Sequence, residues 1–461
     1  MIKRFIAEKD TSIVNAFKPD LLIRATGSNQ GFSDSLEIFN IAKQASSGSL
    51  ELSRILIQFP IDDIINDINI GIIPSSAEYH LRMYNAVHPY TVPRGYTMAI
   101  QAISRSWDEG TGLSMEDYSD DGFANWIYAS DGVAWTTEGG DYSGSVYTAS
   151  FDEGDEDLSV DITSLVREWI SGSANYGVGV HLSGTFETAL TSSYTKKFYA
   201  RGSQYYYKRP IIEARWDASI LDDRGSFYAS SSLASAADNL NKIYLYNVIR
   251  GQLSNIPSIG TGSIYVKLYT SESGGTALSD IITGSYETTG IYSAELALDT
   301  TASIAYDRWY NLGSSICFHT GTIDINSFNS SEYNPNSAYI TQIVNLKNEP
   351  YQREENPRFR LFVRQKDWQP TIYTVAISTP ETEVIESAYY RIFREDDNCE
   401  VVGYGTGSVE YTKLSRDSSG NYFDFDMSLL EGGYSYLLMF MYYINGEYRE
   451  QSEVFRFRVE E

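Results

Sequence analysis

The feature that most constrains this chain is its hydrophobic period, which is two residues along much of the sequence. In residues 264–269 the apolar Ile264, Val266 and Leu268 alternate with more polar neighbours, and residues 292–298 repeat the pattern. Such alternation is typical of a strand with one buried face. Because Gly, Ser, Asn and Asp punctuate the short runs, the sequence predicts an all-β fold of sandwiches rather than a parallel α/β sheet.

One segment, residues 161–171, departs from this period and predicts a helix. Asp161 or Thr163 is expected to cap its start, and Gly172 to end it. Its apolar residues recur at helical spacing and form one face, composed of Ile162, Leu165, Val166 and Trp169.

With 461 residues the chain is too long for one hydrophobic core. Strand alternation stops twice, near residue 217 and in the polar stretch 347–357, which contains two prolines. The sequence therefore predicts three sandwiches at 1–217, 218–346 and 358–461, with 347–357 as a linker or exposed loop.

The end of the chain carries the clearest local signal. Asn445-Gly446 separates two strand-like runs, and this dipeptide tolerates positive φ at both central positions of a two-residue hairpin. In the final strand Phe455, Phe457 and Val459 are expected to face the core.

The net charge of the chain limits the kinds of molecule that it is expected to bind. Lys and Arg total 35 against 61 Asp and Glu, a net charge of −26, which repels phosphate backbones and anionic lipids. We expect no nucleic-acid partner and no membrane partner, and no apolar run is long enough to span a bilayer. The 37 tyrosines favour protein or sugar contacts, since tyrosine is enriched at interfaces.

The first ten residues contain no apolar segment typical of a signal peptide, and two cysteines cannot make a disulfide framework. Synthesis in the host cytoplasm is expected. A strand-rich chain without export signal or disulfides fits a virion protein, which is assembled inside the host and released by lysis.

Enzyme chemistry finds little support in the sequence. His80, His88, His181 and His319 lack metal-ligand spacing, and neither cysteine has a CxxC partner. The common nucleophile, phosphate and dinucleotide motifs are absent. A glycosidase carboxylate pair stays open, because its geometry is tertiary. We therefore predict a non-enzymatic protein and assign no catalytic residue, cofactor or metal.

Two acidic runs, 117–121 and 152–157, are dense enough in oxygen to consider Ca²⁺. The second lacks the alternating ligand spacing of an EF-hand loop, so a solvated acidic loop is the preferred interpretation. Trp126 and Trp135 lie in Gly- and Asp-rich sequence and are the candidates for stacking on a sugar ring, whereas Trp169 belongs to the helix face.

The first domain resembles the DNRLRE family in an ordered set of segments, namely LSRILIQFPI at 52–61, SRSWDEG at 104–110, DITSLVREW at 161–169, NYGV at 175–178, FYAR at 198–201 and Arg209-Pro210. The resemblance implies a jelly-roll-like sandwich used in adhesive, carbohydrate-binding, wall-associated or virion proteins. Residues 198–203 lack the acidic residue usual after Arg201 in this family.

Two further resemblances concern the whole chain and its end. Residues 3–29 and 364–424 resemble structural proteins of tailed phages, particularly T4-like phages of marine bacteria. Leu430, Gly433 and Tyr436 resemble the corner before a late strand of an immunoglobulin or fibronectin type III sandwich.

These observations lead to one hypothesis and two rivals. The first is a non-enzymatic structural component of a phage virion, at the neck, tail or capsid surface, which packs against other virion proteins and against its own copies. The main rival is an extracellular carbohydrate-binding or adhesive module that recognises a host-surface glycan. A depolymerase acting on the host envelope ranks last.

Overall fold

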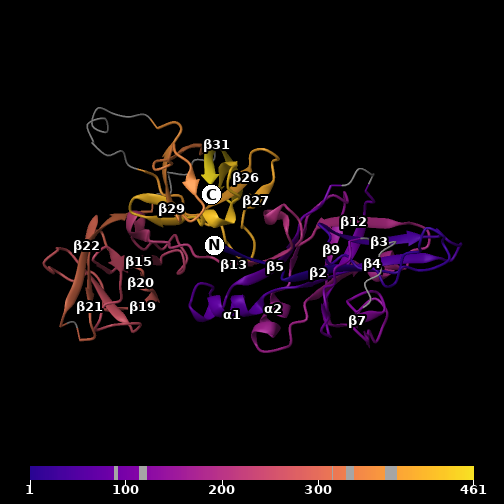
Figure 1. Cartoon of the computed structure of the whole chain (residues 1–461). Coiled ribbons are helices and arrows are strands. Elements are labelled where there is room, and N and C mark those ends of the chain that lie inside the picture. The colour runs from indigo at the N-terminus through magenta and orange to yellow at the C-terminus, as the bar shows by residue number, and fades with distance from the viewer. Residues whose placement is uncertain (88–91, 114–121, 314, 329–336, 369–381) are drawn as a thin grey trace. The chain divides into compact units, whose positions relative to one another are not determined.

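The computed structural model describes residues 1–461 except 88–91, 114–121, 314, 329–336 and 369–381. The fold is all-β, as predicted, and its described residues form two compact units, Met1–Trp216 (unit 1) and Asp217–Glu461 (unit 2) (Figure 1). Within the described ranges no helix has the length and apolarity needed to cross a membrane.

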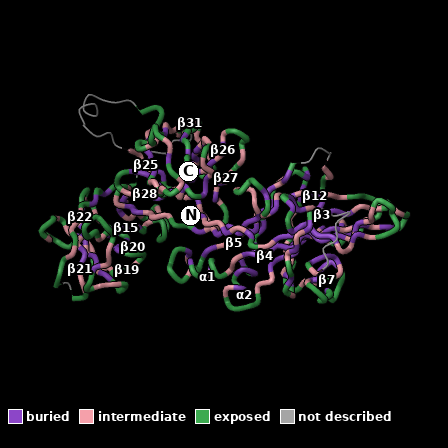
Figure 2. The backbone as a smooth tube through the Cα atoms, viewed as in Figure 1, coloured by how far each residue is buried: buried purple, intermediate pink, exposed green. Residues whose placement is uncertain are grey.

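Unit 1 is a sandwich of two antiparallel sheets. The smaller sheet has the order β1 (Ile2–Ile6), β13 (Ile211–Arg215), β5 (Glu78–Met83), β10 (Leu158–Asp161). The larger one runs β12 (Tyr194–Tyr199), β3 (Ser35–Ala42), β4 (Leu50–Gln58), β11 (Val178–Leu182), β6 (Tyr96–Ile103), β9 (Tyr142–Phe151), and β2 (Lys9–Val14) also pairs with β4. Alternate residues from both sheets, such as Leu81, Ile55 and Val180, fill the core between them. Figure 2 shows buried positions along these strands.

The predicted helix is α2 (Thr163–Ile170), and its apolar face is buried as expected. The N-cap residue is Ile162 rather than the expected Asp161 or Thr163, and the Asp161 carboxylate, one residue earlier, accepts the Thr163 N–H at 2.8 Å. Gly172 follows the helix with φ +107°, a conformation that suits glycine.

The helix α1 (Ile61–Asn69) was not predicted. Its isoleucines at 61, 64, 65 and 68 follow the helical period, and Ile64 is fully buried. Because isoleucine also favours strands, this isoleucine-rich segment between two strands did not stand out as a helix in the sequence.

The first part of unit 2 is one seven-stranded sheet that curls around a single core containing Val266, Tyr292 and Trp309. Its order is β14 (Phe227–Tyr228), β22 (Cys317–Asn326), β21 (Ile304–Tyr310), β18 (Ile264–Tyr269), β19 (Ile282–Thr288), β20 (Ile291–Leu296), β15 (Asn241–Tyr246). Two further strands, β16 (Val248–Ile249) and β17 (Gln252–Leu253), form a short hairpin.

The rest of unit 2 has the strand order of an immunoglobulin sandwich. One sheet runs β23 (Tyr339–Ile343), β25 (Arg358–Gln365), β29 (Gly420–Asp424), β28 (Ser415–Asp417), which is the order A-B-E-D. The other runs β24 (Tyr351–Gln352), β31 (Glu447–Glu460), β30 (Ser435–Ile444), β26 (Ala388–Arg394), β27 (Glu400–Val402), with G-F-C-C′ after the short β24.

A tyrosine corner supports this assignment. The Tyr436 hydroxyl, near the start of strand F, accepts the Glu431 N–H and donates to the Glu431 carbonyl oxygen, both at 2.8 Å. Leu430 is fully buried and Gly433 has φ +87°. The immunoglobulin-like character predicted for these residues is confirmed.

The predicted hairpin is also confirmed, since Asn445 (φ +54°) and Gly446 (φ +84°) join β30 to β31. Phe457 and Val459 of the final strand are buried, at 4% and 0% exposure. The Asn-Gly turn and the alternation of apolar and polar side chains along the last strand therefore predict this end of the fold.

The predicted boundary at 346 and the linker 347–357 need correction. Strand β23 precedes residue 346 but pairs with β25, so it belongs to the immunoglobulin-like sandwich. Tyr351, inside the expected linker, is 1% exposed and pairs in β24 with Val459. Its ring packs on Phe359 and Phe457, and burial of this aromatic surface outweighs the polar sequence around it.

Candidate functional site

Unit 1 contains a pocket of about 540 Å³ beside β3. Because side chains alternate along a strand, Glu37, Phe39 and Ile41 of β3 face the pocket, while Leu36 and Ile38 point into the main core. The segment after β2 and the strands β4 and β12 complete the walls, with Ala16, Phe17, Gln30, Gln44, Glu51, Ser193, Tyr194 and Thr195.

The segment after β2 is held in place by Arg24. Its guanidinium lies 4.2 Å from the centre of the Phe17 ring and donates to the carbonyl oxygens of Asn15 (2.6 Å) and Leu50 (3.1 Å). Two of the lining residues, Ala16 and Phe39, also form a small apolar cluster with Val14. The aromatic wall at Phe17 is therefore preformed.

Two buried acceptor oxygens distinguish this pocket. Glu51 is 2% exposed, and its Oε2 accepts the Phe17 N–H at 2.7 Å, but its Oε1 has no hydrogen-bond partner among the described residues. The side-chain oxygen of Gln30, which is 6% exposed, also lacks one. An unsatisfied buried polar atom costs about 1–3 kcal/mol, so a ligand that brings donors would recover this energy.

The second carboxylate that lines the pocket, Glu37, differs from Glu51 because it has a charged partner. Lys197 Nζ lies 3.0 Å from Glu37 Oε1, and both side chains are about one-third exposed. Its charge is thus already compensated, whereas that of Glu51 is compensated only by a backbone N–H. The pocket favours a neutral ligand rich in hydroxyl groups or a cationic one over an anion.

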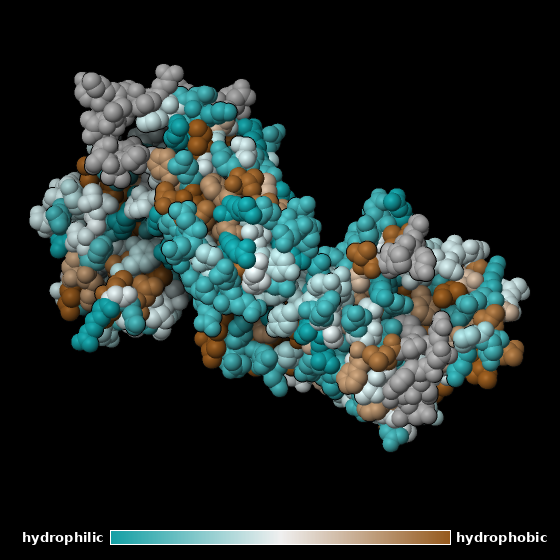
Figure 3. Space-filling view, turned by 45° about the horizontal axis from the view of Figure 1, so that its top comes forward, coloured by the Kyte–Doolittle hydropathy of each residue, from teal (hydrophilic) through white to brown (hydrophobic). Residues whose placement is uncertain are grey.

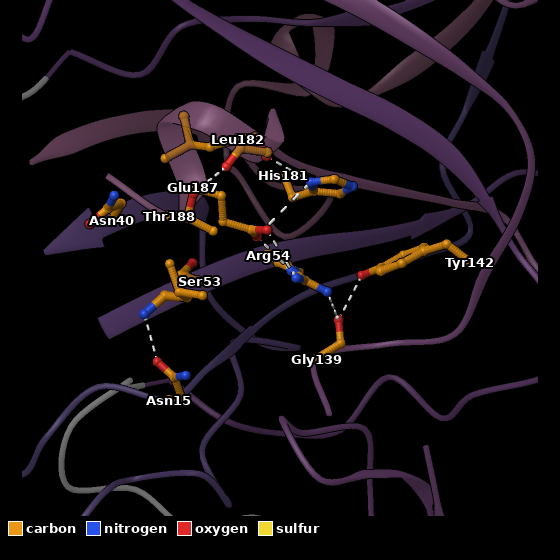
Figure 4. Close-up of polar contacts among 12 residues, drawn as sticks. Asn15, Asn40, Ser53, Arg54, Gly139, Tyr142, His181, Leu182, Glu187 and Thr188 are labelled. Atoms are coloured by element: carbon orange, nitrogen blue, oxygen red, sulfur yellow. Dashed lines mark hydrogen bonds and ion pairs between the residues drawn. The ribbon is translucent and has the colours of Figure 1, made fainter. Parts of the chain in front are cut away.

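A network of polar contacts centred on Arg54 lies beside the pocket (Figure 4). Arg54 pairs with Glu187 through Nε–Oε1 (2.8 Å) and Nη2–Oε2 (3.1 Å), and Nη1 donates to the Gly139 carbonyl oxygen. The Asn40 amide donates to the carbonyl oxygens of Phe186 and Ala189. These bonds fix the short helix α3 (Gly184–Glu187), from which the chain continues to the pocket residues 193–195.

Tyr142 and His181 complete this network (Figure 4). Burial raises the pKa of Tyr142 to about 12, so the neutral hydroxyl donates to Gly139 at 2.8 Å. Burial also lowers the pKa of His181, whose Nδ1 lies 2.8 Å from the Leu182 carbonyl oxygen. Both side chains are occupied by structural hydrogen bonds.

The prediction that Trp126 and Trp135 stack on sugar is wrong. They are 4% and 5% exposed and pack with Trp107 in a second core on unit 1, near β7 (Tyr128–Ser130) and β8 (Val133–Ala134). Trp135 donates its ring N–H to the Asn125 carbonyl oxygen at 2.8 Å. Large aromatic rings in Gly-rich sequence were buried because the loops fold over them.

The acidic run 152–157 is an ordered loop, and its acidic residues Asp152, Glu153, Asp155 and Asp157 are exposed to solvent, as the preferred interpretation expected. The fully buried Lys196 donates to Asn85 Oδ1 (2.8 Å) and to the carbonyl oxygens of Gly154 (3.0 Å) and Glu156 (2.7 Å). The Lys196 ammonium group is thus held by two backbone carbonyl oxygens of this loop and by the amide oxygen of Asn85. The other run, 117–121, lies outside the described residues.

The described histidines do not come together in a metal site. His80, His181 and His319 lie on separate strands, and His88 falls outside the described residues. In the part of the chain that the structure describes, no group of three or more His, Cys, Asp or Glu side chains could hold a metal ion.

Two of the DNRLRE-like segments meet in space. Arg201 makes a bidentate pair with Glu109, at 2.8 Å to each oxygen, and its N–H bonds to the buried Asp10. Glu109 thus supplies a carboxylate partner to Arg201 from a distant segment. The pocket could not be predicted from the sequence, because Gln30 and Glu51 belong to no motif and line one pocket only in the folded chain.

The fold and the pocket define an all-β protein of sandwich modules that ends in an immunoglobulin-like sandwich. No protein-family model matches the chain, and no curated protein matches it. Solved structures with some likeness include the adhesin InvE of Yersinia pseudotuberculosis, with 11% identity and a TM-score of 0.16 over 50% of this chain and 56% of that one. This chain thus spans just over half of the adhesin's length.

Two immunoglobulin modules are similar at the same low level. The N-terminal Ig1-2 module of the Drosophila receptor protein tyrosine phosphatase DLAR has 7% identity and a TM-score of 0.15, covering 48% of this chain and 91% of that one. DIP-gamma IG1+IG2 has 11% identity and a TM-score of 0.13, with 51% and 92% covered. Scores this low carry no argument, so the immunoglobulin-like assignment rests on strand order and the tyrosine corner.

Proposed function

We propose that this chain is a non-enzymatic structural component of a phage virion, which acts by packing its sandwich modules against other virion proteins. The virion setting is supported by the resemblance of residues 3–29 and 364–424 to structural proteins of tailed phages. The modular all-β architecture suits a spacer that presents rigid surfaces.

The proposal rests mainly on buried ion pairs that connect different strands within each unit. In unit 1 the buried Glu213 pairs with Arg4, Arg82 and Arg215, which come from three strands of one sheet. In unit 2 the Arg224–Asp307 pair (2.7 Å) and the Arg416–Asp223 pair (2.6 Å) connect the segment before β14 to both sheet systems. Buried ion pairs whose partners come from different strands hold these strands in one arrangement, which suits a particle component better than a moving active site.

The test is to locate the chain in purified particles. Antibodies against unit 1 are expected to label intact particles in electron micrographs, and peptides from both units should be found in particle digests at a fixed ratio to the major capsid protein. A chain present in the lysate but missing from washed particles would contradict the proposal.

A second candidate function, glycan binding, is favoured by the pocket. Its aromatic walls at Phe17, Phe39 and Tyr194 can contact a sugar ring, and the free oxygens of Gln30 and Glu51 can accept from sugar hydroxyls. Binding here would make the protein an attachment component.

Titration calorimetry with host-surface oligosaccharides tests this candidate. The Glu51→Gln variant keeps an acceptor for the Phe17 N–H but removes the charge, and should weaken binding about tenfold, a typical loss for one charge-assisted hydrogen bond. Glu138→Gln, an exposed change in the same unit, is the control and should bind normally. Equal affinities of both variants, or no binding by the wild type, would reject glycan binding at this pocket.

A further inference from the structure

The strand β9 forms an edge of the larger sheet of unit 1. Among described strands it pairs only with β6, so one side of its backbone is left without a neighbouring strand. Inward residues such as Tyr147 and Phe151 pack toward the main core, which holds the strand in place. Val146, by contrast, is 56% exposed. β9 is therefore a fixed edge strand, which pairs with β6 in regular register from Val146 to Phe151 and has an irregularity between Ser143 and Val146, where Gly144 has φ +75°.

The composition of this edge is unusual for the chain. Its ten residues, Tyr-Ser-Gly-Ser-Val-Tyr-Thr-Ala-Ser-Phe, include no charged side chain and no proline. Proteins normally protect long edges with charges, prolines or short strands, because a bare edge pairs with other chains. The other described strands at the ends of these sheet orders follow that rule, being either charged (β1, β10, β12, β15, β27, β28) or at most five residues long (β14, β23, β24).

We propose that β9 is a self-association edge, at which two copies of this chain pair β9 with β9 in antiparallel orientation. A twofold axis places the same uncharged surface on both copies, so the strands meet without the repulsion that a net charge of −26 imposes elsewhere. Paired Val, Thr and Tyr side chains across such an edge are favourable cross-strand neighbours. The two sheets would then form one continuous sheet through the dimer.

The flanking residues predict how salt acts on this dimer. Asp141 precedes β9 and Asp152 follows it, so antiparallel pairing brings Asp141 of one copy toward Asp152 of the other. Salt screens this repulsion, because the Debye length falls from about 10 Å at 0.1 M to about 3 Å at 1 M ionic strength. Dimerisation should therefore strengthen as salt rises, the opposite of an interface held by ion pairs.

This inference deepens the proposed packing role and rests on it, but it is tested on the purified full chain, independently of particle labelling. Light scattering over a concentration and salt series should show a dimer for the wild type. The Val146→Lys/Thr148→Lys variant places like charges opposite one another and should weaken the dimer about tenfold or more. Thr283→Lys/Ser285→Lys adds the same charge to exposed positions of β19, which has strands on both sides, and should dimerise as the wild type does.

Hydrogen exchange of the wild type provides a readout that does not depend on variants. Amides of β9 should become protected as concentration rises. A monomeric wild type at every salt concentration, an unaffected β9 variant, equal loss in both variants, or protection confined to another segment would each overturn the proposal.

Discussion

At the scale of single residues, burial decides what each polar group does. Asp10 is inaccessible to solvent, its Oδ2 accepts the Arg201 N–H, and its Oδ1 lacks a partner among the described residues. Burial raises the pKa of Asp10 from 3.8 to about 7. Between these values the folded chain retains a proton that the unfolded chain has lost.

The first prediction follows from this proton. Folding stability contributed by Asp10 should be present below pH 4 and lost as pH rises to about 7, because there the folded state binds more protons. Asp10→Asn keeps an acceptor for Arg201 and should gain about 4 kcal/mol over the wild type at pH 8, since the pKa of Asp10 is raised by about three units and each unit is worth about 1.4 kcal/mol. Urea unfolding at pH 4 and pH 8 measures this gain.

The exposed Asp131→Asn is the control for that experiment and should retain the wild-type pH profile. If Asp10→Asn were less stable than the wild type at pH 8, the raised pKa would not describe Asp10 in the folded protein.

At the scale of elements, hydrogen bonds at strand ends fix how the sheets connect. The Tyr436 hydroxyl uses both its donor and its acceptor on the backbone of Glu431, and the residue is 1% exposed. The Tyr436 hydroxyl therefore anchors the loop between strands E and F at Glu431.

The second prediction is that Tyr436→Phe destabilises unit 2 by about 1–3 kcal/mol, because the N–H and C=O of Glu431 lose a buried partner. Tyr443→Phe on the same strand is the control, since this side chain is 44% exposed and its loss should cost little. Denaturant unfolding followed by signals from unit 2 compares them. Equal midpoints for both variants would show that the corner does not stabilise the sandwich.

At the scale of the whole molecule, the chain is acidic and divided into two compact units. On the face seen in Figure 3, hydrophobic residues lie in small groups among hydrophilic ones. The division follows Trp216, and Asp217 is exposed. The segment 347–357, in contrast, is tied into the fold by Tyr351.

The third prediction concerns proteolysis. Brief digestion should cut first near Asp217 and yield fragments close to Met1–Trp216 and Asp217–Glu461. The bonds around Tyr351 should survive longer, because its ring is buried and its backbone pairs with β31. Mass spectrometry of a digestion time course gives the order of cuts. Early cleavage at 347–357 would restore the linker interpretation.

The sequence alone determined the features that depend on neighbours along the chain. The all-β class, the helix α2, the β30–β31 hairpin and the corner at Tyr436 follow from side-chain period, capping and turn conformation, which act over a few residues. Only the tertiary structure decided that Trp126, Trp135 and Tyr351 are buried. It also decided that the Lys196 ammonium group binds the acidic loop, and that Gln30 and Glu51 line one pocket. These depend on which distant segments pack together, and a polar or aromatic side chain has no local signal that tells a buried partner from solvent.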